Sequence, residues 1–329
     1  MRIQEFEYFA PKTATEACSF LSQFKGHVKL MAGGTDLLVS MKQKIKTSER
    51  VIGLKGISDL SYIRQTGPDL SIGSMTRIGT LERSDIINSR LPFLADAARS
   101  VASPNLRNAG TIGGNICLDT RCCYYNKSDS FRNLIGPCLK LAGEVCHVAS
   151  KSKKCFAVSQ GDTIPVLIAL GTKVAIQSLD GKRTIPLEDL YRDDGKDYLT
   201  IGPEEMITEI SIPGPKPYSG GSYRKLRARK ATDFAWVSVS VHITLGKGIC
   251  EDIRIVLGSV GSSPIRVVKA EEVVRGKKIT DDLLEEAAEL ASKQAKPVAN
   301  MVKVLPSYRK EMARVITIQA AREALARAR

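Results

Sequence analysis

A strict alternation of apolar and polar side chains over residues 237–245 limits the folds open to this chain more than any other feature. The apolar members are Val237, Val239, Val241, Ile243 and Leu245, with Ser238, Ser240, His242 and Thr244 between them. Successive side chains of a β-strand point to opposite faces of a sheet, so a period of two predicts a strand with one buried face. Residues 253, 255 and 257 repeat the apolar pattern, and we therefore expect an antiparallel sheet here.

Helices are predicted in other parts of the chain. Apolar residues at positions 17, 20, 21 and 24 have the spacing that lines one face of a helix. Thr280 can cap another helix, whose buried stripe would consist of Leu283, Leu284, Ala287, Ala288 and Ala291. The dipeptide Asp180-Gly181, between two strand-like runs, predicts a β-hairpin. Helices together with antiparallel strands indicate an α+β fold.

A segment rich in proline and glycine, residues 212–221, is the best candidate for a linker, because these residue types weaken both helices and strands. With 329 residues the chain is long enough for about two or three domains, and we place a boundary near residue 215. The longest apolar run, residues 164–170, is far shorter than the ~20 residues of a membrane span. The first residues lack the pattern of a secretory signal, so we expect a cytoplasmic protein with reduced thiols.

Two glycine-rich segments carry the first chemical signal. The first contains Gly33-Gly34-Thr35-Asp36 after a short apolar run, an order that predicts a strand, a glycine turn and a helix beginning near Leu37. The second is Gly110-Thr-Ile-Gly-Gly-Asn115. Glycine lets consecutive backbone N–H groups turn toward a phosphate, and a helix N-terminus adds partial positive charge. Neither segment has the spacing of a Walker or Rossmann motif. A single glycine pair is more often a simple tight turn, but two such segments indicate a phosphate-bearing cofactor.

Five segments together resemble the FAD-binding subunits of the xanthine oxidase family of molybdenum hydroxylases. They are residues 32–37, 73–78, 110–116, 162–170 and 223–227, and they spread over nearly the whole chain. The resemblance implies a two-lobed FAD-binding domain of the vanillyl-alcohol-oxidase type, with lobes at residues 1–55 and 56–215. It also implies a C-terminal domain of antiparallel sheet and helices at residues 216–329.

The same resemblance implies which residues hold FAD. Gly33, Gly34, Thr35 and Asp36 would hold the diphosphate from one side, and Thr111, Gly114 and Asn115 from the other. Asp162 matches an acidic residue that binds the sugar-like part of the flavin. Lys225 matches a basic residue near the flavin ring, a place that Arg224 would take if the match shifted by one residue. The implied site is completed by Lys29, Ala32, Leu37, Thr76 and Gly110.

Between Asn115 and Asp162 the chain has 46 residues, where most subunits of this family have far fewer. This insert, residues 117–160, holds six of the eight cysteines: Cys117, Cys122, Cys123, Cys138, Cys146 and Cys155. It has few aliphatic residues, so burial alone does not explain how it is ordered, and disulfides are not expected in the cytoplasm. Zinc and iron–sulfur clusters both take four thiolates, and unliganded reduced cysteines are a further interpretation.

Spacing and charge favour an iron–sulfur cluster in the insert. The candidate thiols at 122, 138, 146 and 155 are separated by 15, 7 and 8 residues, without the closely spaced cysteine pairs of most zinc sites. Such wide spacing suits a larger object. The insert also has seven Lys and Arg against three acidic residues, and positive neighbours stabilise a negatively charged [4Fe–4S] cluster.

The insert resembles that of one branch of the family, the β subunits of 4-hydroxybenzoyl-CoA reductases. This resemblance implies that the cluster ligands are Cys122, Cys138, Cys146 and Cys155. It leaves Cys123 pointing away from the cluster and Cys117 at the edge of the flavin loop. Cys18 and Cys250 are interpreted as ordinary buried thiols.

A flavin and a cluster on one chain would form an electron relay, because a flavin accepts two electrons and a cluster passes one at a time. The resemblance implies a large partner subunit with molybdenum and molybdopterin, a small one with [2Fe–2S] clusters, and a dimer of heterotrimers. In the reductase branch, electrons would run from ferredoxin through the cluster and FAD to molybdenum, for reductive dehydroxylation of 4-hydroxybenzoyl-CoA or a related aromatic. In a hydroxylase they would run outward to an external acceptor. We expect no catalytic residue on this chain.

The net charge of +14 is compatible with a nucleic acid, an anionic cofactor or an acidic protein partner. Basic residues are dense at 151–154, 216–230 and 309–329, but no aromatic residues alternate with them as in a single-strand binding platform. We therefore expect no nucleic-acid partner, with a zinc-stabilised nucleic-acid-binding module as the alternative. Complementary charge would favour an acidic ferredoxin.

Overall fold

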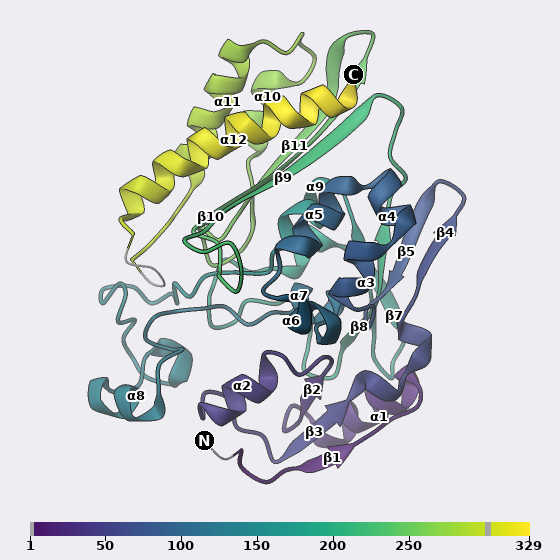
Figure 1. The fold of residues 1–329 in the computed structure, drawn as a ribbon. Helices are drawn as coiled ribbons and strands as arrows, with labels where there is room; N and C mark the ends of the chain where they lie inside the picture. Colours follow the sequence, from purple (N-terminus) through teal and green to yellow (C-terminus); the bar gives the residue numbers. More distant parts are fainter. Residues whose placement is uncertain (1–2, 300–303) are drawn as a thin grey trace.

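Three β-sheets organise the protein, whose computed structural model describes residues 3–299 and 304–329 (Figure 1). The first sheet is parallel with order β1-β3-β2, the second is antiparallel with order β4-β5-β8-β6-β7, and the third is antiparallel with order β12-β11-β10-β9. The predicted α+β class is confirmed. In the described parts of the chain, no helix combines the length and the apolar character that crossing a membrane requires.

The strands are β1 (Glu7–Phe9), β2 (Lys29–Met31), β3 (Arg50–Gly53), β4 (Ile63–Thr66), β5 (Asp69–Gly73), β6 (Lys173–Gln177), β7 (Lys182–Pro186), β8 (Met206–Ile212), β9 (Ser219–Leu226), β10 (Val237–Gly246), β11 (Ile249–Gly258) and β12 (Ile265–Arg266). The α-helices are α1 (Ala14–Phe24), α2 (Leu37–Lys42), α3 (Ile78–Arg83), α4 (Asp85–Arg90), α5 (Pro92–Ser100), α6 (Pro104–Ala109), α7 (Ile112–Ile116), α8 (Asp129–Ile135), α9 (Ile164–Ala169), α10 (Val268–Val274), α11 (Asp281–Gln294) and α12 (Pro306–Ala328). Short 3₁₀ helices are η1 (Leu54–Gly56), η2 (Ser58–Leu60), η3 (Leu139–Leu141) and η4 (Leu187–Leu190).

The first sheet and its two helices have the predicted order of strand, glycine turn and helix. Strand β2 leads through residues 33–36 into α2. Helix α1 begins after Thr13, whose hydroxyl accepts a hydrogen bond from the Glu16 N–H at 3.1 Å, and it buries Ala17, Cys18 and Leu21. These apolar contacts fix α1 on the sheet. The glycine turn after β2 lies against the second glycine segment, since Gly33 packs on Ala109 and Gly110.

The second sheet packs against a layer of short helices, α3 to α7 and α9 (Figure 1). The predicted hairpin is confirmed: β6 and β7 pair antiparallel around Asp180-Gly181, and Gly181 has a φ of 147°. All six residues of α9 are buried, because this helix lies between the second and third sheets. The second glycine segment forms the start of α7, within this helical layer.

The third sheet is covered by α10, α11 and α12 on one face (Figure 1). Helices α5 and α9 of the helical layer pack on the other face. The prediction that β10 has one exposed face is therefore wrong. Ser238 and Ser240 on its polar face are no more than 1% exposed, and the Ser240 hydroxyl donates to the Ser222 carbonyl at 3.1 Å. Small side chains that satisfy their own hydrogen bonds allow this face to pack against α9. The predicted cap of α11 is confirmed, since the Thr280 hydroxyl accepts from the Leu283 N–H at 3.3 Å.

The glycines at the end of the predicted linker have a different role from flexibility. Gly220 and Gly221 lie inside β9, so only residues 213–218 connect β8 with β9. A Cβ atom on Gly220 would lie 2.4 Å from the Ala324 carbonyl oxygen of α12, and one on Gly221 would lie 2.3 Å from the Phe93 ring. Both glycines allow neighbouring elements to approach the strand closely.

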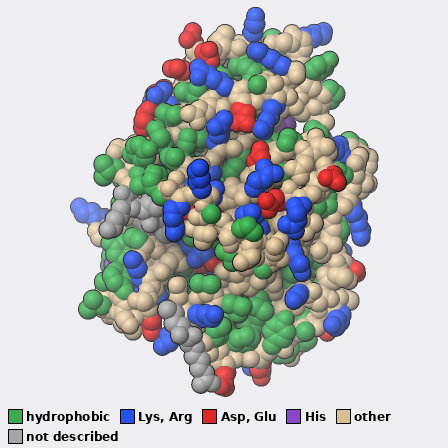
Figure 2. All heavy atoms as spheres, in the orientation of Figure 1, with side chains coloured by type: hydrophobic (Ala, Val, Ile, Leu, Met, Phe, Trp, Pro, Cys, Tyr) green, Lys and Arg blue, Asp and Glu red, His purple; other side chains and the backbone are tan. Residues whose placement is uncertain are grey.

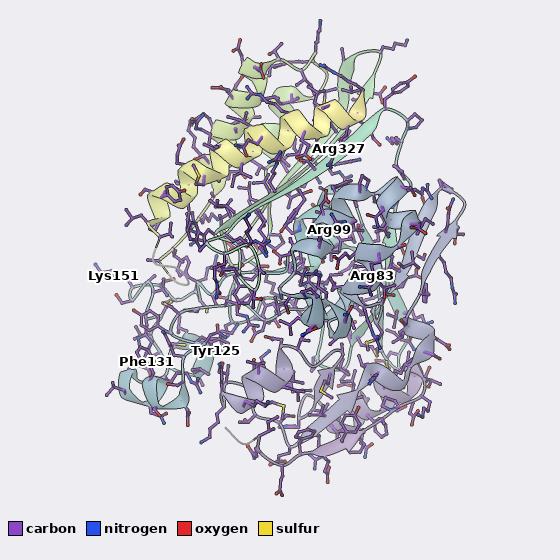
Figure 3. All side chains as sticks on the ribbon, in the orientation of Figure 1. Arg83, Arg99, Tyr125, Phe131, Lys151 and Arg327 are labelled. Carbon is purple, nitrogen blue, oxygen red and sulfur yellow. The ribbon has the colours of Figure 1, made fainter. Side chains whose placement is uncertain are left out.

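The insert is mostly irregular and projects beside α2, with α8 at its outer end (Figure 1). Arg132 of α8 is buried, and its guanidinium donates to the carbonyl oxygens of Gln43 and Lys44 at 2.8 and 3.1 Å, and to that of Lys127. Figure 3 shows Tyr125 on the side of the insert nearer α2 and Lys151 at its outer edge. Arg132 therefore fastens the insert to the C-terminal end of α2.

A buried histidine in β10 gives the protein a pH-dependent stability. The His242 ring stacks on Phe93 with centroids 5.9 Å apart, and burial, followed by the charge of Arg254, lowers its pKa from 6.5 to about 4. The imidazole of His242 binds a proton near pH 6.5 in the unfolded chain but only near pH 4 in the folded chain. The contribution of the neutral ring to the free energy of unfolding is therefore full above pH 6.5, declines below it, and is lost as the pH falls through about 4. We expect His242→Gln to reduce the loss of unfolding free energy between these pH values, measured by urea titration. Equal losses in both proteins would contradict this.

Candidate functional site

The two glycine segments meet at one large cavity. Its volume is about 580 Å³, within the roughly 300–1,000 Å³ of small-molecule sites. The cavity lining includes these residues of the predicted FAD site: Lys29, Ala32, Gly33, Gly34, Thr35, Asp36, Leu37, Gly110, Thr111, Gly114, Asn115 and Asp162. Cys117 also lines it, at the place expected for the edge of the flavin loop.

Close packing explains why the first segment is rich in glycine. A Cβ atom on Gly33 would lie 2.1 Å from the Ala109 carbonyl oxygen, and Gly34 has a φ of 71°. The backbone N–H groups of residues 33–36 make no hydrogen bond within the described parts of the chain. Four consecutive free N–H groups that lead into the N-terminus of α2 form a site for an anion such as a diphosphate.

The second glycine segment contributes differently, because most of its N–H groups are already paired. The N–H groups of Ile112 and Gly113 donate to the carbonyl oxygens of Thr76 and Ser74, and the Gly114 N–H donates to the Thr111 hydroxyl. The Asn115 side-chain oxygen accepts from the Thr163 hydroxyl at 2.7 Å. This segment therefore forms a rigid wall that faces the free N–H groups of the first segment.

Two residues of the predicted FAD site do not line the cavity. The Thr76 hydroxyl donates to the Tyr62 carbonyl at 2.8 Å and accepts from the Tyr62 N–H at 3.0 Å, so it fastens a loop. The Lys225 ammonium donates to Asp162 at 2.8 Å and to the Ser100 carbonyl at 3.1 Å. Burial lowers the pKa of Lys225 while Asp162 opposes this. Lys225 lies behind Asp162 and holds the carboxylate at the cavity wall.

Arg121, which the sequence analysis did not select, reaches the same cavity from the insert. Its guanidinium forms an ion pair with Asp36 and lies 5.3 Å from the centre of the Phe234 ring. Its Nε atom is buried without a hydrogen-bond partner in the described parts of the chain. A buried donor without a partner is costly, and a phosphate oxygen in the cavity would supply one. In the sequence, the one signal for Arg121 is its position directly before Cys122.

We expect Arg121→Gln to weaken FAD binding about tenfold or more, because a hydrogen bond to a charged group is worth ~1.5–3 kcal/mol. The variant also leaves the Asp36 carboxylate without its positive partner beside the diphosphate. FAD titration of the flavin-free chain, followed by flavin fluorescence, measures the change. Arg99→Gln is the matched control, since Arg99 pairs with Asp96 on the surface at 3.0 Å. Equal affinities of Arg121→Gln and wild type would contradict this role.

The four cysteines implied as cluster ligands lie together around a second, small cavity in the insert. Cys122, Cys138, Cys146 and Cys155 all line it, and each is between 6% and 8% exposed. They are spread over 34 residues that include α8 and η3, so their convergence is a property of the fold. Cys123 is partly exposed and does not line the cavity. Cys18 and Cys250 are buried elsewhere, as predicted.

Four cysteines are the donor set that a [4Fe–4S] cluster requires, and a structural zinc ion takes the same set. Within residues 3–299 and 304–329, no three His, Cys, Asp or Glu side chains are grouped so that they could hold a metal ion. The four cysteines nevertheless line one cavity. Burial raises the pKa of Cys155 to about 11, so this thiol is protonated at neutral pH unless a bound metal centre lowers its pKa.

The fold, the paired glycine segments and the large cavity together fit a protein that binds a diphosphate-bearing cofactor, and comparison with known proteins identifies the class as FAD-binding subunits. The family model "FAD binding domain in molybdopterin dehydrogenase" matches residues 4–215, and "CO dehydrogenase flavoprotein C-terminal domain" matches residues 221–324. The chain belongs to the family of FAD-binding medium subunits of molybdenum hydroxylases.

Individual relatives support this assignment over nearly the full chain. The carbon monoxide dehydrogenase medium chain of Hydrogenophaga pseudoflava is 30% identical over 298 residues, covering 90% of this chain and 89% of the relative. The nicotinate dehydrogenase FAD-subunit of Eubacterium barkeri is 27% identical over 314 residues, covering 94% and 92%. A solved carbon monoxide dehydrogenase from H. pseudoflava that lacks the Mo-pyranopterin moiety matches with a TM-score of 0.83 and 29% identity, covering 99% of both chains.

Proposed function

We propose that this chain carries FAD and a [4Fe–4S] cluster and passes electrons within a molybdenum-dependent reductase of the 4-hydroxybenzoyl-CoA type. The observation that carries the proposal is the convergence of four insert cysteines on one buried cavity. Four thiolates are the ligand set that such a cluster takes. Electrons would enter from a ferredoxin-like donor, pass through the cluster and FAD, and leave toward the molybdenum site for reductive dehydroxylation of an aromatic thioester.

The chain's own residues would bind and orient the flavin. The free N–H groups of residues 33–36 and the Arg121 guanidinium would hold the diphosphate, while Asp162, held by Lys225, would accept hydrogen bonds from the sugar-like part. When bound, FAD supplies the ability to accept two electrons and release them singly. Cys122, Cys138, Cys146 and Cys155 would hold the cluster.

The decisive experiment is cofactor analysis of the full-length chain, purified without oxygen together with its partner subunits. We expect one FAD, about four iron atoms and about four acid-labile sulfides for each copy of this chain, beyond the iron of the [2Fe–2S] subunit. FAD with no additional iron or sulfide would rule out the cluster and leave a plain flavin subunit.

An outward relay is the second candidate, because the relatives named above are dehydrogenases of carbon monoxide and nicotinate. In that case electrons would run from the substrate through FAD to an external acceptor. The two directions differ in what reduces the purified complex. Reduction of the flavin by an aromatic or heterocyclic substrate would support the outward relay, and reduction of 4-hydroxybenzoyl-CoA by dithionite-reduced complex would support the proposed reductase.

The proposed partners are a large molybdenum subunit, a small [2Fe–2S] subunit and a ferredoxin. The names of relatives as medium chains are compatible with a complex of three kinds of subunit, for which we propose a dimer of heterotrimers. Lys and Arg side chains are spread over much of the face in Figure 2, and the net charge is +14. We expect ferredoxin-dependent reduction to slow as ionic strength rises, and an unchanged rate would exclude electrostatic docking.

A further inference from the structure

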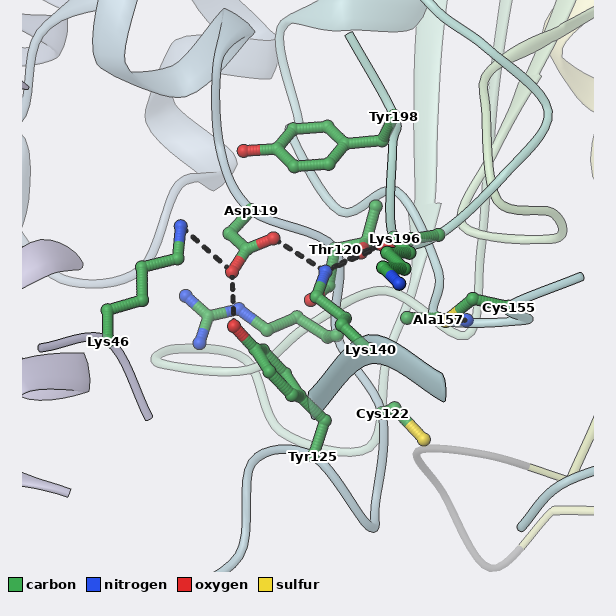
Figure 4. Close-up of polar contacts among 12 residues, drawn as sticks. Lys46, Asp119, Thr120, Cys122, Tyr125, Lys140, Cys155, Ala157, Lys196 and Tyr198 are labelled. Atoms are coloured by element: carbon green, nitrogen blue, oxygen red, sulfur yellow. Dashed lines mark hydrogen bonds and ion pairs between the residues drawn. The ribbon is translucent and has the colours of Figure 1, made fainter. Parts of the chain in front are cut away.

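The flavin cavity and the cysteine cavity share a wall built around a buried carboxylate. Asp119 lines the flavin cavity, while Lys140 and Tyr125 line the cysteine cavity. The Asp119 carboxylate accepts from the Lys140 ammonium at 2.6 Å and from the Tyr125 hydroxyl at 3.0 Å (Figure 4). Lys46, from the loop after α2, lies 3.0 Å from the same carboxylate. One side chain therefore contacts groups that belong to both cavities.

Lys140 lies between two tyrosine rings, one from each cavity. Its Nζ atom is 4.6 Å from the centre of the Tyr125 ring and 5.2 Å from that of the Tyr198 ring. Tyr198 lines the flavin cavity, and its hydroxyl donates to the Cys117 carbonyl at 3.2 Å. Lys140 also donates to the Gly195 carbonyl at 2.7 Å and to the Thr120 hydroxyl. An ammonium held by so many partners has one fixed position.

This wall carries a surplus of positive charge, because a partly exposed Lys46 adds to a buried Lys140–Asp119 pair. The side chains of Lys140 and Asp119 are only 5% and 4% exposed. Burial opposes ionisation of Asp119, but Lys140 and Lys46 outweigh it and hold the pKa of the carboxyl below its ordinary value. Two lysines therefore face one carboxylate. Replacing a buried ion pair by apolar residues is often neutral or stabilising, so stability alone does not account for this arrangement.

The surplus has an electrostatic effect on both sides of the wall. A cluster with four thiolates carries net negative charge, and its potential depends on nearby charges and hydrogen bonds. A positive charge on the cavity wall stabilises the reduced, more negative state and so raises the reduction potential. Among the described residues that line the cysteine cavity, Lys140 is the one lysine or arginine.

We propose that Lys140, held in place by Asp119, is the positioning residue that raises the reduction potential of the cluster. The inference rests on the proposed function. If both groups are bound, the cluster would give up one electron at a time, and the flavin would be fully reduced by two such electrons and one proton from water, with a ferredoxin-class donor resupplying the cluster. Lys140 and Asp119 would be neither oxidised nor reduced.

The test is a redox titration of the full-length chain in its complex, with iron, sulfide and FAD counted in every sample. In Lys140→Met we expect iron and FAD to be retained and the reduced-to-oxidised ratio of the cluster, at the wild-type midpoint, to fall about tenfold, equivalent to about 59 mV for one electron. Lys151→Met removes the same charge at the outer edge of the insert, where Lys151 is exposed, and is expected to leave the midpoint unchanged. Asp119→Asn removes the opposing negative charge and is expected to raise it.

The outcomes separate this inference from the proposed function. Absence of additional iron in the wild-type complex defeats the proposed function. Full iron content with unchanged potentials in Lys140→Met overturns the inference alone. If Lys140→Met loses its iron, the potential of Asp119→Asn decides: a higher midpoint supports the inference and an unchanged one overturns it. Loss of iron in both variants would show that these residues only build the cluster site, and the inference would be wrong.

Discussion

Replacing Cys138 by serine is expected to reduce the additional iron from about four atoms per chain to less than one, because a [4Fe–4S] cluster needs four thiolates. The brown absorption of the cluster should disappear. FAD content should stay near that of the wild type, since Cys138 lines only the small cavity and the flavin cavity is built by other residues. Iron analysis and the visible spectrum of oxygen-free preparations measure both effects.

The control for this change is Cys250→Ser. Cys250 is also a buried thiol, in β11 of the third sheet, and its Sγ donates to the Asp252 carbonyl at 3.5 Å. It lies outside both cavities, so this variant should keep its iron. Full iron content in Cys138→Ser would remove Cys138 from the ligand set, and equal loss of iron in Cys250→Ser would show that the effect is not specific.

A single methyl group at Gly33 is expected to abolish stable FAD binding. The added Cβ of Gly33→Ala would lie 2.1 Å from the Ala109 carbonyl oxygen, so the two glycine segments must separate. The free N–H groups of residues 33–36 would then no longer face the second segment. Overpacking of this kind belongs to the mechanisms that cause the largest losses of free energy in point variants. We therefore expect the variant to be purified with less than a tenth of the wild-type flavin, measured by absorbance after denaturation.

Gly202→Ala provides the matched control for the added methyl group. Its Cβ would meet nothing closer than the Glu205 carboxylate at 3.6 Å, which is ordinary contact. This variant should retain FAD. Thermal unfolding of flavin-free samples separates loss of binding from loss of folding: Gly33→Ala with normal flavin content would contradict the close approach of the two segments.

Local patterns predicted the features that depend on neighbouring residues in the chain. The order of strand, glycine turn and helix around residues 29–42, the hairpin at Asp180-Gly181 and the cap at Thr280 all follow from short-range backbone preferences. Of the fourteen FAD-binding residues that the family resemblance implies, twelve line a single cavity. All four implied cluster cysteines line another cavity. Their roles as ligands are proposals that the experiments above test.

Features that depend on packing between distant segments were not predictable. Ser238 and Ser240 have the pattern of an exposed strand face, and nothing local shows that α9 covers them. Gly220 and Gly221 resemble a linker because the approach of α12 and Phe93 is a long-range contact. Arg121, Asp119 and Lys140 lie in a mostly irregular insert without periodicity. The ion pair of Arg121 with Asp36 and that of Lys140 with Asp119 therefore emerge only from the folded chain.

The attachment of α8 separates the position of the insert from the chemistry of its cysteines. Arg132 fastens the insert through backbone carbonyl oxygens of residues 43 and 44, and none of these contacts involves a cysteine. The anchoring of α8 beside α2 therefore does not depend on what the four cysteines hold, and a chain without those thiols should keep α8 docked.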